Sequence, residues 1–141
     1  MREILFRAKR YNGDWVEGNL FIPDLPYTPT QICIGTNIVR ISYDVIPETV
    51  GEFTGLYNGA GQKIFEGDIV RFEGELYRVR REDETPGGYW ASTDYILQHI
   101  GRNDYMSFVD TIDDYSNEIC VEIIGNIHDN PELLKKSEDT E

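Results

Sequence analysis

The densest group of side chains that could do chemistry is a set of four carboxylates near the C-terminus: Asp110, Asp113, Asp114 and Glu118. Close carboxylates bind Ca²⁺ or Mg²⁺ because these hard cations prefer oxygen ligands. The spacing lacks the ligand positions and the central glycine of an EF-hand loop, and Ile112 and Tyr115 interrupt it. The pattern therefore favours a solvated acidic loop, and these four residues are the candidates for any metal site.

Nucleophilic catalysis would depend on one of the two histidines, His99 and His128. Sites of the Ser-His-Asp or Cys-His kind use an imidazole as the general base. Neither histidine lies in a motif typical of a base, so both are predicted at the surface or at helix ends. The sequence predicts no catalytic residue and no cofactor, and it leaves a small metal-dependent hydrolase as an alternative.

The two cysteines, Cys33 and Cys120, each lie in an apolar, strand-like run and are far apart in the sequence. The chain has no CxxC pair and no cluster of cysteine with histidine, so neither a zinc site nor a disulfide framework is indicated. We expect two buried free thiols in a reducing compartment.

A glycine-rich stretch from Gly55 to Gly61 has the composition of a phosphate-binding loop. A Walker loop requires Gly-Lys-Ser/Thr at the start of a helix, whereas Gly61 here precedes a strand-like run that begins at Lys63. The dinucleotide fingerprint GxGxxG is absent as well. The stretch is therefore interpreted as a hairpin turn.

This stretch belongs to a longer motif, Glu52 to Phe72 (EFTGLYNGAGQKIFEGDIVRF), and a second motif follows at Gly125 to Leu134 (GNIHDNPELL). The first indicates a strand, a glycine turn and a second strand opened by Glu-Gly-Asp. The second indicates a strand that stops at a proline-initiated turn of helix. Together the two motifs closely resemble the YopX family of phage and prophage proteins. The resemblance implies a fold and a genomic setting, without an established biochemical function.

Seven residues of these motifs are interpreted as a structural signature: Gly55, Gly67, Asp68, Gly125, Asn126, Asn130 and Pro131. Glycine supplies backbone conformations that other residues avoid, and aspartate or asparagine hydrogen-bonds the amides of a turn. Asn130 is a favourable N-cap, and Pro131 is a favourable first residue of a helix. A role of Asp68 as a ligand or catalytic acid is the less favoured interpretation.

Composition and alternation predict strands rather than helices, because Val, Ile, Tyr, Phe and Thr are plentiful while Ala and Met are scarce. Ile4 to Lys9 alternates as a half-buried strand, with Ile4, Phe6 and Ala8 on one face. Asn12-Gly13 predicts a type I′ hairpin turn into a returning strand. Residues 94–100 predict a short helix, with a strand as the competing interpretation.

The predicted fold is mainly β and YopX-like. An N-terminal hairpin-rich lobe (residues 1–50) packs on a small SH3-like barrel (residues 51–135), with one or two short helices and a polar tail (residues 136–141). A single compact domain is the alternative. The barrel is suggested by Gly-Asp-Ile-Val, a turn and Tyr-Arg-Val, a pattern similar to the opening of many small SH3-like barrels.

A formal net charge of −13 limits the kinds of partner. Such a surface repels phosphate backbones and anionic lipids, so direct binding of nucleic acids or membranes is disfavoured. No apolar run approaches the roughly 20 residues of a spanning helix, and the N-terminus lacks a signal-peptide core. We expect a cytoplasmic location in a bacterial host.

Aromatic side chains at turns or loop edges are the candidates for binding a protein: Trp15, Tyr57, Tyr89, Trp90 and Tyr95. Exposed aromatics beside acidic rims often form interface hot spots. The sequence favours a non-catalytic accessory protein that binds an unknown host or phage protein, and its edge strands favour a homo-oligomer. An acidic inhibitor that mimics nucleic acid is a further alternative, motivated by the excess of carboxylates in the C-terminal half.

Overall fold

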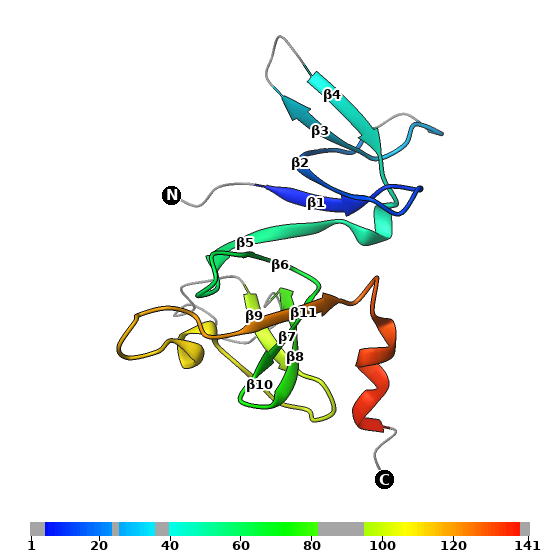
Figure 1. The fold of residues 1–141 in the computed structure, drawn as a ribbon. Helices are drawn as coiled ribbons and strands as arrows, with labels where there is room; N and C mark the ends of the chain where they lie inside the picture. The colour runs from blue at the N-terminus through cyan, green and yellow to red at the C-terminus, as the bar shows by residue number, and fades with distance from the viewer. Residues whose placement is uncertain (1–4, 24–25, 36–39, 82–94, 139–141) are drawn as a thin grey trace, which may run out of the picture. The chain divides into compact units, whose positions relative to one another are not determined.

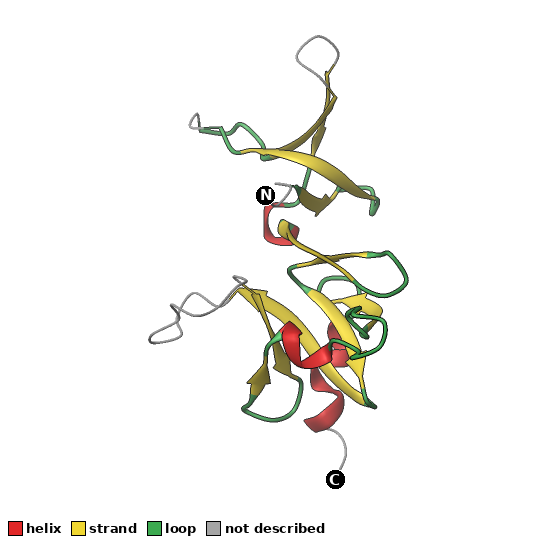
Figure 2. Ribbon diagram, turned by 90° about the vertical axis from the view of Figure 1, so that its left-hand side faces the viewer, coloured by secondary structure: helices red, strands yellow, loops and turns green. Residues whose placement is uncertain are grey.

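The computed structural model describes residues 5–23, 26–35, 40–81 and 95–138. Over these residues the chain is mainly β, with antiparallel sheets and only short 3₁₀ helices, as Figure 2 shows by colour. The mainly β class predicted from the sequence is thereby confirmed. The chain forms two compact units, Met1–Gly55 (unit 1) and Leu56–Glu141 (unit 2).

Unit 1 is built from strands that pair mostly with their neighbours along the chain. They are β1 (Phe6–Lys9), β2 (Trp15–Phe21), β3 (Gln31–Gly35), β4 (Arg40–Asp44) and the first part of β5 (Gly51–Tyr57), with the 3₁₀ helix η1 (Pro47–Thr49) before β5. Their order is β4-β3-β2-β1-β5, so β4 forms an edge of the sheet (Figure 1). Gly55, the last residue of the unit, interrupts β5 with a φ of 87°.

One face of the unit 1 sheet is apolar, as the period-2 alternation of strands requires. The strand register places these side chains on it: Phe6, Ala8, Val16, Leu20, Ile32, Ile34, Ile41 and Tyr43. Ala8 and Ile32 are fully buried, whereas Ile34 and Ile41 form an exposed cross-strand pair at the far end of this apolar face. The predicted placement of Phe6 and Ala8 on one face is confirmed, and Ile4, the third residue of that prediction, lies outside the described residues.

Unit 2 contains a five-stranded antiparallel sheet, a two-strand ribbon and short helices. Its elements are β6 (Lys63–Phe65), β7 (Asp68–Phe72), β8 (Glu75–Arg81), β9 (Tyr95–His99), β10 (Tyr105–Met106), η3 (Phe108–Thr111), β11 (Glu122–Asn126) and η4 (Pro131–Glu138). The large sheet has the order β10-β9-β8-β7-β11, and β6 lies beside β5. Among the described strands this sheet does not close on itself, so the SH3-like barrel stays a prediction.

The core of unit 2 lies on one face of this sheet. It is formed by Ile64, Val70, Tyr77, Val79, Tyr95, Leu97, Phe108, Ile119 and Val121. The short helix predicted for residues 94–100 is wrong, because Tyr95–His99 is strand β9 and pairs with β8 over its whole length. Alternate residues of β9 face this core, and a strand that contributes every second side chain outcompetes an isolated turn of helix.

The turn after β1 differs from the sequence prediction. At Tyr11–Gly13 only Gly13 has a positive φ (98°), and the Gly13 N–H donates to Arg10 O at 2.9 Å. This is a three-residue loop with a type I turn and a glycine bulge, so the predicted type I′ turn is wrong there. Glu73 and Gly74, with φ of 51° and 82°, form a two-residue turn between β7 and β8, where two positive φ values are the type I′ signature.

The cysteines are free, as expected, but the predicted burial of both thiols is wrong. Cys33 is half-buried on the polar face of β3, where its Sγ lies 3.2 Å from Ser42 Oγ, and Cys120 is exposed. The Cys33 side chain lies on the face of β3 opposite the buried Ile32, so its apolar neighbours in the sequence do not cover it. No helix in the described part of the chain is long and apolar enough to cross a membrane.

The close approach of β2 and β3 predicts a strong effect of a single methyl group. A Cβ at Gly18 would lie 2.5 Å from the main-chain oxygen of Cys33, so the backbone must shift. We expect Gly18→Ala to lower the free energy of unfolding by about 1–3 kcal/mol. Asn19→Ala, at the exposed neighbouring position, is the control and should change it by less than about 0.5 kcal/mol. Urea denaturation measures both, and equal stabilities would contradict the close approach.

Candidate functional site

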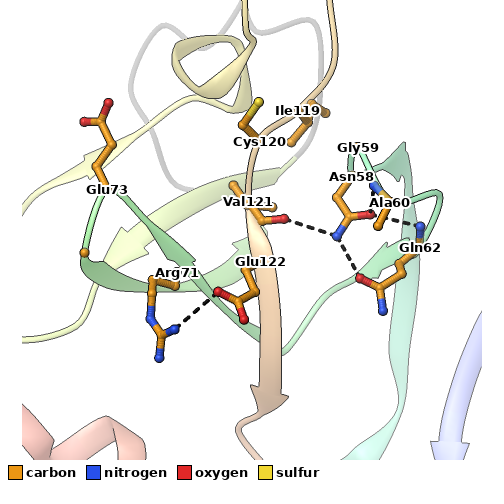
Figure 3. A pocket seen from close by; sticks show the side chains of 11 residues that line it. Asn58, Gly59, Ala60, Gln62, Arg71, Glu73, Ile119, Cys120, Val121 and Glu122 are labelled. Carbon is orange, nitrogen blue, oxygen red and sulfur yellow. Dashed lines mark hydrogen bonds and ion pairs between the residues drawn. The ribbon is translucent and has the colours of Figure 1, made fainter. Parts of the chain in front are cut away.

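The buried side chain of Asn58 organises the glycine turn of unit 2 (Figure 3). Its Oδ1 accepts hydrogen bonds from the backbone amides of Ala60 and Gln62, both at 3.0 Å. Its Nδ2 donates to Gln62 Oε1 at 2.9 Å and to the main-chain oxygen of Val121 at 3.1 Å. One side chain therefore closes the turn and also holds a segment 63 residues further along the chain.

The segment from Ile119 to Val121 is held from two sides. The Gly59 N–H donates to Ile119 O at 2.9 Å, and the Cys120 N–H donates to Thr111 O at 3.0 Å. A Cβ at Gly59 would lie 2.9 Å from Glu118 Oε1, so a glycine at this position permits the close approach. The segment thus connects the glycine turn with the last residue of η3.

An open groove of about 400 Å³ lies beside this segment. It is lined by Asn58, Gly59, Ala60, Gln62, Arg71, Glu73, Gly74, Ile119, Cys120, Val121 and Glu122 (Figure 3). Arg71 and Glu122 form an ion pair of 3.2 Å from β7 to β11, and both side chains are exposed. Exposed pairs of this type contribute only about 0–1 kcal/mol, so the pair can rearrange around a ligand at little cost.

One thiol, Cys120, lines the groove, and its Sγ lies 3.5 Å from the main-chain oxygen of Glu118. A cysteine nucleophile needs a base or a cation that stabilises the thiolate. None of the lining residues is a histidine, and Arg71, the cation among them, pairs with Glu122. The groove therefore offers Cys120 no imidazole base.

The Glu-Gly-Asp motif closes the turn between β6 and β7. Gly67 has a φ of 95°, and the buried Asp68 accepts a hydrogen bond from the Phe65 N–H at 2.8 Å through Oδ2. The Gly67 oxygen accepts from the Ile127 N–H at 2.9 Å. These contacts give Gly67 and Asp68 a structural role and join the first motif to the second.

The second motif is a tight turn of asparagines. Asn126 Oδ1 accepts from the amides of His128 and Asp129 at 3.0 and 2.9 Å, and Asn130 Oδ1 accepts from the Asn126 N–H at 3.2 Å. A Cβ at Gly125 would lie 2.2 Å from Asn130 Oδ1. The chain then enters η4, which begins at Pro131. Only glycine leaves room for this turn at position 125.

Residues 5–135 match the family model described as YopX protein. The chain belongs to the YopX family. No curated protein matches it. Among solved structures, the crystal structure of protein EF1440 from Enterococcus faecalis is similar, with 23% sequence identity, a TM-score of 0.44 and coverage of 95% of this chain and 99% of that chain.

In this YopX family chain the four candidate metal ligands lie in or next to one turn, residues 107–118, which we name the acidic turn. Asp110 Oδ2 accepts from the Ser107 N–H at 3.2 Å and completes a capping box for η3. Asp113 Oδ2 accepts from the amides of Tyr115 and Ser116 at 3.0 and 2.8 Å. Two of the four carboxylates are thus bound to the backbone of the turn itself.

The described residues contain no group of three or more His, Cys, Asp or Glu side chains placed to hold a metal ion. Asp114 and Glu118 are exposed, and the Glu118 main-chain oxygen accepts from the Asp113 N–H at 2.9 Å. The acidic turn is therefore explained by its own hydrogen bonds, and the metal interpretation gains no support from its geometry.

His99 is buried, so its predicted surface or helix-end position is wrong. Its Nδ1 accepts from the Arg102 N–H at 3.1 Å, and its Nε2 contacts Glu75 Oε1. The hydrogen bond from His99 and the nearby Arg102 guanidinium hold the pKa of Glu75 below its ordinary value. Both ring nitrogens are occupied by protein groups, so His99 has no nitrogen left for a substrate.

The candidate aromatics do not form one site. Tyr57 is exposed, as predicted, and Trp15 is half-buried with the Arg7 guanidinium 5.0 Å from its ring centroid. Tyr95 is only 1% exposed, so its predicted exposure is wrong: as the first residue of β9 it faces the unit 2 core. Tyr89 and Trp90 lie outside the described residues.

Sequence reasoning missed Asn58 and the groove that it supports. The available signal was an asparagine directly before a glycine turn, a position from which its side chain can bind amides two residues further on. The contact with Val121 had no sequence signal, because it joins residues 63 positions apart.

The four bonds of the Asn58 side chain predict a large effect of its removal. Asn58→Ala leaves the Val121 oxygen and two turn amides without this partner, and we expect a loss of about 2–4 kcal/mol in the free energy of unfolding. Gln62→Ala removes a single side-chain contact and is the control, with an expected loss below about 1 kcal/mol. Chemical denaturation followed by tryptophan fluorescence measures both, and similar losses would contradict the role assigned to Asn58.

The hydrogen bonds to Asp113 predict a shifted titration. The Ser116 amide and hydroxyl are the main causes that hold the pKa of Asp113 below its ordinary value, with a smaller contribution from the Tyr115 amide. The carboxylate form stabilises the fold above the ordinary value of about 3.9, and this stabilisation is lost as pH falls through the lowered pKa. NMR titration should place the midpoint of Asp113 below the ordinary value of about 3.9, and Ser116→Ala should raise it. A midpoint at or above the ordinary value would contradict the contacts.

Proposed function

We propose that this YopX family chain is a non-catalytic protein-binding module, encoded by a phage or prophage and acting in the cytoplasm of the bacterial host. The observation that carries the proposal is the acidic turn, which presents exposed apolar side chains on a hydrogen-bonded frame. The SH3-like arrangement expected for unit 2 is part of the same proposal, because domains of that type bind extended peptide segments.

The acidic turn exposes three large apolar side chains: Val109, Ile112 and Tyr115. Val109 belongs to the 3₁₀ helix η3, and Ile112 is the residue directly after it. Tyr115 is 99% exposed. Exposed apolar side chains that gather in one turn mark an interaction surface more often than scattered ones do.

The backbone of the acidic turn is held by hydrogen bonds within the chain, without a partner. The capping box at Ser107, the amide bonds to Asp113 and the link from Cys120 to Thr111 fix its backbone. Binding costs less conformational entropy when the contacting segment is preorganised. The acidic turn therefore has the two properties of a docking surface, exposed apolar area and a fixed shape.

Charge defines the kind of partner. Asp114 and Glu118 are exposed beside the apolar side chains, and unit 2 as a whole carries nineteen acidic and eight basic residues. A partner with an apolar patch and a basic rim complements this surface, and the opposite charges accelerate its association. The groove beside Ile119 continues from the same segment and can accept a side chain of that partner.

Two other functions have less support. A nucleic-acid mimic requires carboxylates without interruption along its surface, whereas the acidic turn alternates them with Val109, Ile112 and Tyr115. A metal-dependent hydrolase would need Asp110 and Asp113 as ligands, and their carboxylates bind backbone amides instead.

The test is a quantitative pull-down from induced host lysate with mass-spectrometric readout, at low and high salt. The wild type is compared with the double variant Val109→Ser/Tyr115→Ser. We expect the variant to retain at most about a tenth of the captured partner, because hot-spot side chains dominate binding energy. The matched control is Tyr11→Ser/Tyr27→Ser, which removes two exposed rings of unit 1 and should retain the partner.

Thermal melts of all three proteins verify that the variants are folded. A partner captured equally by the acidic-turn variant would overturn the assignment of the surface. Absence of any stoichiometric partner at either salt would overturn the proposed function. Loss of the partner from the wild type at high salt would favour charge mimicry over apolar docking.

A further inference from the structure

Of the two histidines in the chain, His99 is the one that the fold buries. It is the last residue of β9, and its side chain is only 7% exposed. Its ring packs edge-on against Tyr77 of β8, with the ring centroids 5.2 Å apart. Histidine is the side chain whose charge ordinarily changes between about pH 5 and 8. A group that can titrate near neutral pH therefore lies inside unit 2.

The two hydrogen bonds of this ring define its protonation state. The Arg102 N–H donates to Nδ1 at 3.1 Å, so Nδ1 carries a lone pair and no proton. The proton of the neutral ring is then on Nε2, which donates to Glu75 Oε1. In this arrangement His99 is the neutral Nε2–H tautomer, with one nitrogen as acceptor and the other as donor.

A second proton on the ring is incompatible with one of these two bonds only. An imidazolium carries N–H groups on both nitrogens, so it still donates to Glu75 but cannot accept from the Arg102 N–H. Two N–H groups would then face each other across 3.1 Å. The Arg102 amide loses its acceptor, and the turn has to move to bring this amide to water. Protonation therefore acts on the turn after β9 and leaves the contact with Glu75 in place.

The charged groups around the ring act in opposite directions. The Glu75 carboxylate favours the imidazolium, and the hydrogen bond from His99 and the charge of Arg102 hold the pKa of Glu75 below its ordinary value. The Arg102 guanidinium, 3.4 Å from Glu75, disfavours the imidazolium, and Asp104, paired with Arg102 at 3.3 Å, weakens that repulsion. Burial raises the pKa of Tyr77, the other titratable group against the ring. Glu75 and Tyr77 therefore keep their charge states between about pH 5 and 8.

The turn that follows His99 is anchored at both of its ends. The Ile100 N–H donates to Leu76 O at 2.9 Å, and the His99 N–H donates to Asp104 O at 3.0 Å. Between these anchors Gly101 has a φ of 114°, a conformation that glycine adopts readily. The residues from Gly101 to Asp104 are exposed, so no core side chain moves with them. A change in the middle of this turn therefore stays local.

We propose that His99 is a pH-sensitive switch: the neutral ring holds the turn after β9 through the Arg102 amide, and the protonated ring releases this turn while it stays bound to Glu75. The released turn leads to β10, the edge strand of the unit 2 sheet. Met106 of β10 packs against the unit 2 core, so the strand itself stays in place. The proposal does not rest on the proposed function, because these residues lie outside the acidic turn.

NMR spectroscopy of the full chain labelled with ¹⁵N tests the switch. At about pH 8 the ring nitrogens of His99 should show the Nε2–H tautomer. As the pH falls to about 5 and the ring titrates, the protection of the Arg102 amide against hydrogen exchange, relative to an unstructured chain, should fall at least about tenfold. The amides between β8 and β9 should keep their protection over the same range, because the strand pairing does not depend on the turn.

Three variants separate the ring from its surroundings. His99→Asn places an amide oxygen where Nδ1 accepts from the Arg102 N–H and cannot be protonated, so the protection of this amide should be equal at both ends of the pH range. Glu75→Gln keeps an acceptor for Nε2–H but removes the charge that favours the imidazolium, so release should require a lower pH. His128→Gln removes the other histidine of the chain and is the matched control, with release as in the wild type.

Several results would overturn the switch. The Nδ1–H tautomer at about pH 8, or a ring that stays neutral down to about pH 5, would do so in the wild type alone. Titration of the ring without a change at the Arg102 amide would do so as well, and so would release that persists in His99→Asn. Loss of protection throughout β8 and β9 at the same pH would show unfolding of the unit instead of a local change. Thermal melts verify that the variants are folded, and the wild-type readouts decide the outcome if one is not.

Discussion

The buried side-chain amide of Asn58 is the contact on which the architecture of unit 2 depends. It satisfies two amides of the glycine turn and at the same time binds the Val121 main-chain oxygen. A buried polar group that lost these partners would remain desolvated and unpaired, which is the costly outcome for a protein interior. The position of Val121 fixes Cys120 and Glu122 on either side of it, and through them one wall of the groove and the start of β11.

The same logic explains why two motifs far apart in the sequence form one structural unit. Asp68 pairs with Asn126 in the register of β7 and β11, and the Gly67 oxygen accepts from the Ile127 N–H. A bulge between Ile123 and Gly125 shifts the register just before this point. The first motif supplies β7 and the Gly67 oxygen, and the second supplies β11 and the Ile127 N–H, so this contact needs both motifs. The glycines of both motifs occur where a Cβ would collide or where φ is positive.

Features that depend on neighbouring residues were predictable, and those that depend on distant pairing were not. Local turn chemistry predicted the hairpin after β1 and the helix start at Pro131, although the hairpin uses a glycine bulge rather than a type I′ turn. Tyr95–His99 forms a strand because it pairs with β8. Periodicity within residues 94–100 alone therefore could not decide between helix and strand. The burial of Tyr95 and His99 follows from that pairing, and was missed with it.

The position of the charges decides which surfaces unit 2 can meet. Unit 1 carries seven acidic and five basic residues, whereas unit 2 carries nineteen and eight. The acidic turn therefore exposes its apolar side chains within a strongly negative unit, which repels an identical surface and attracts a basic one. Because the hydrogen bonds of Asp110 and Asp113 fix the backbone of this turn, the same carboxylates that order the turn also set the sign of the charge around it.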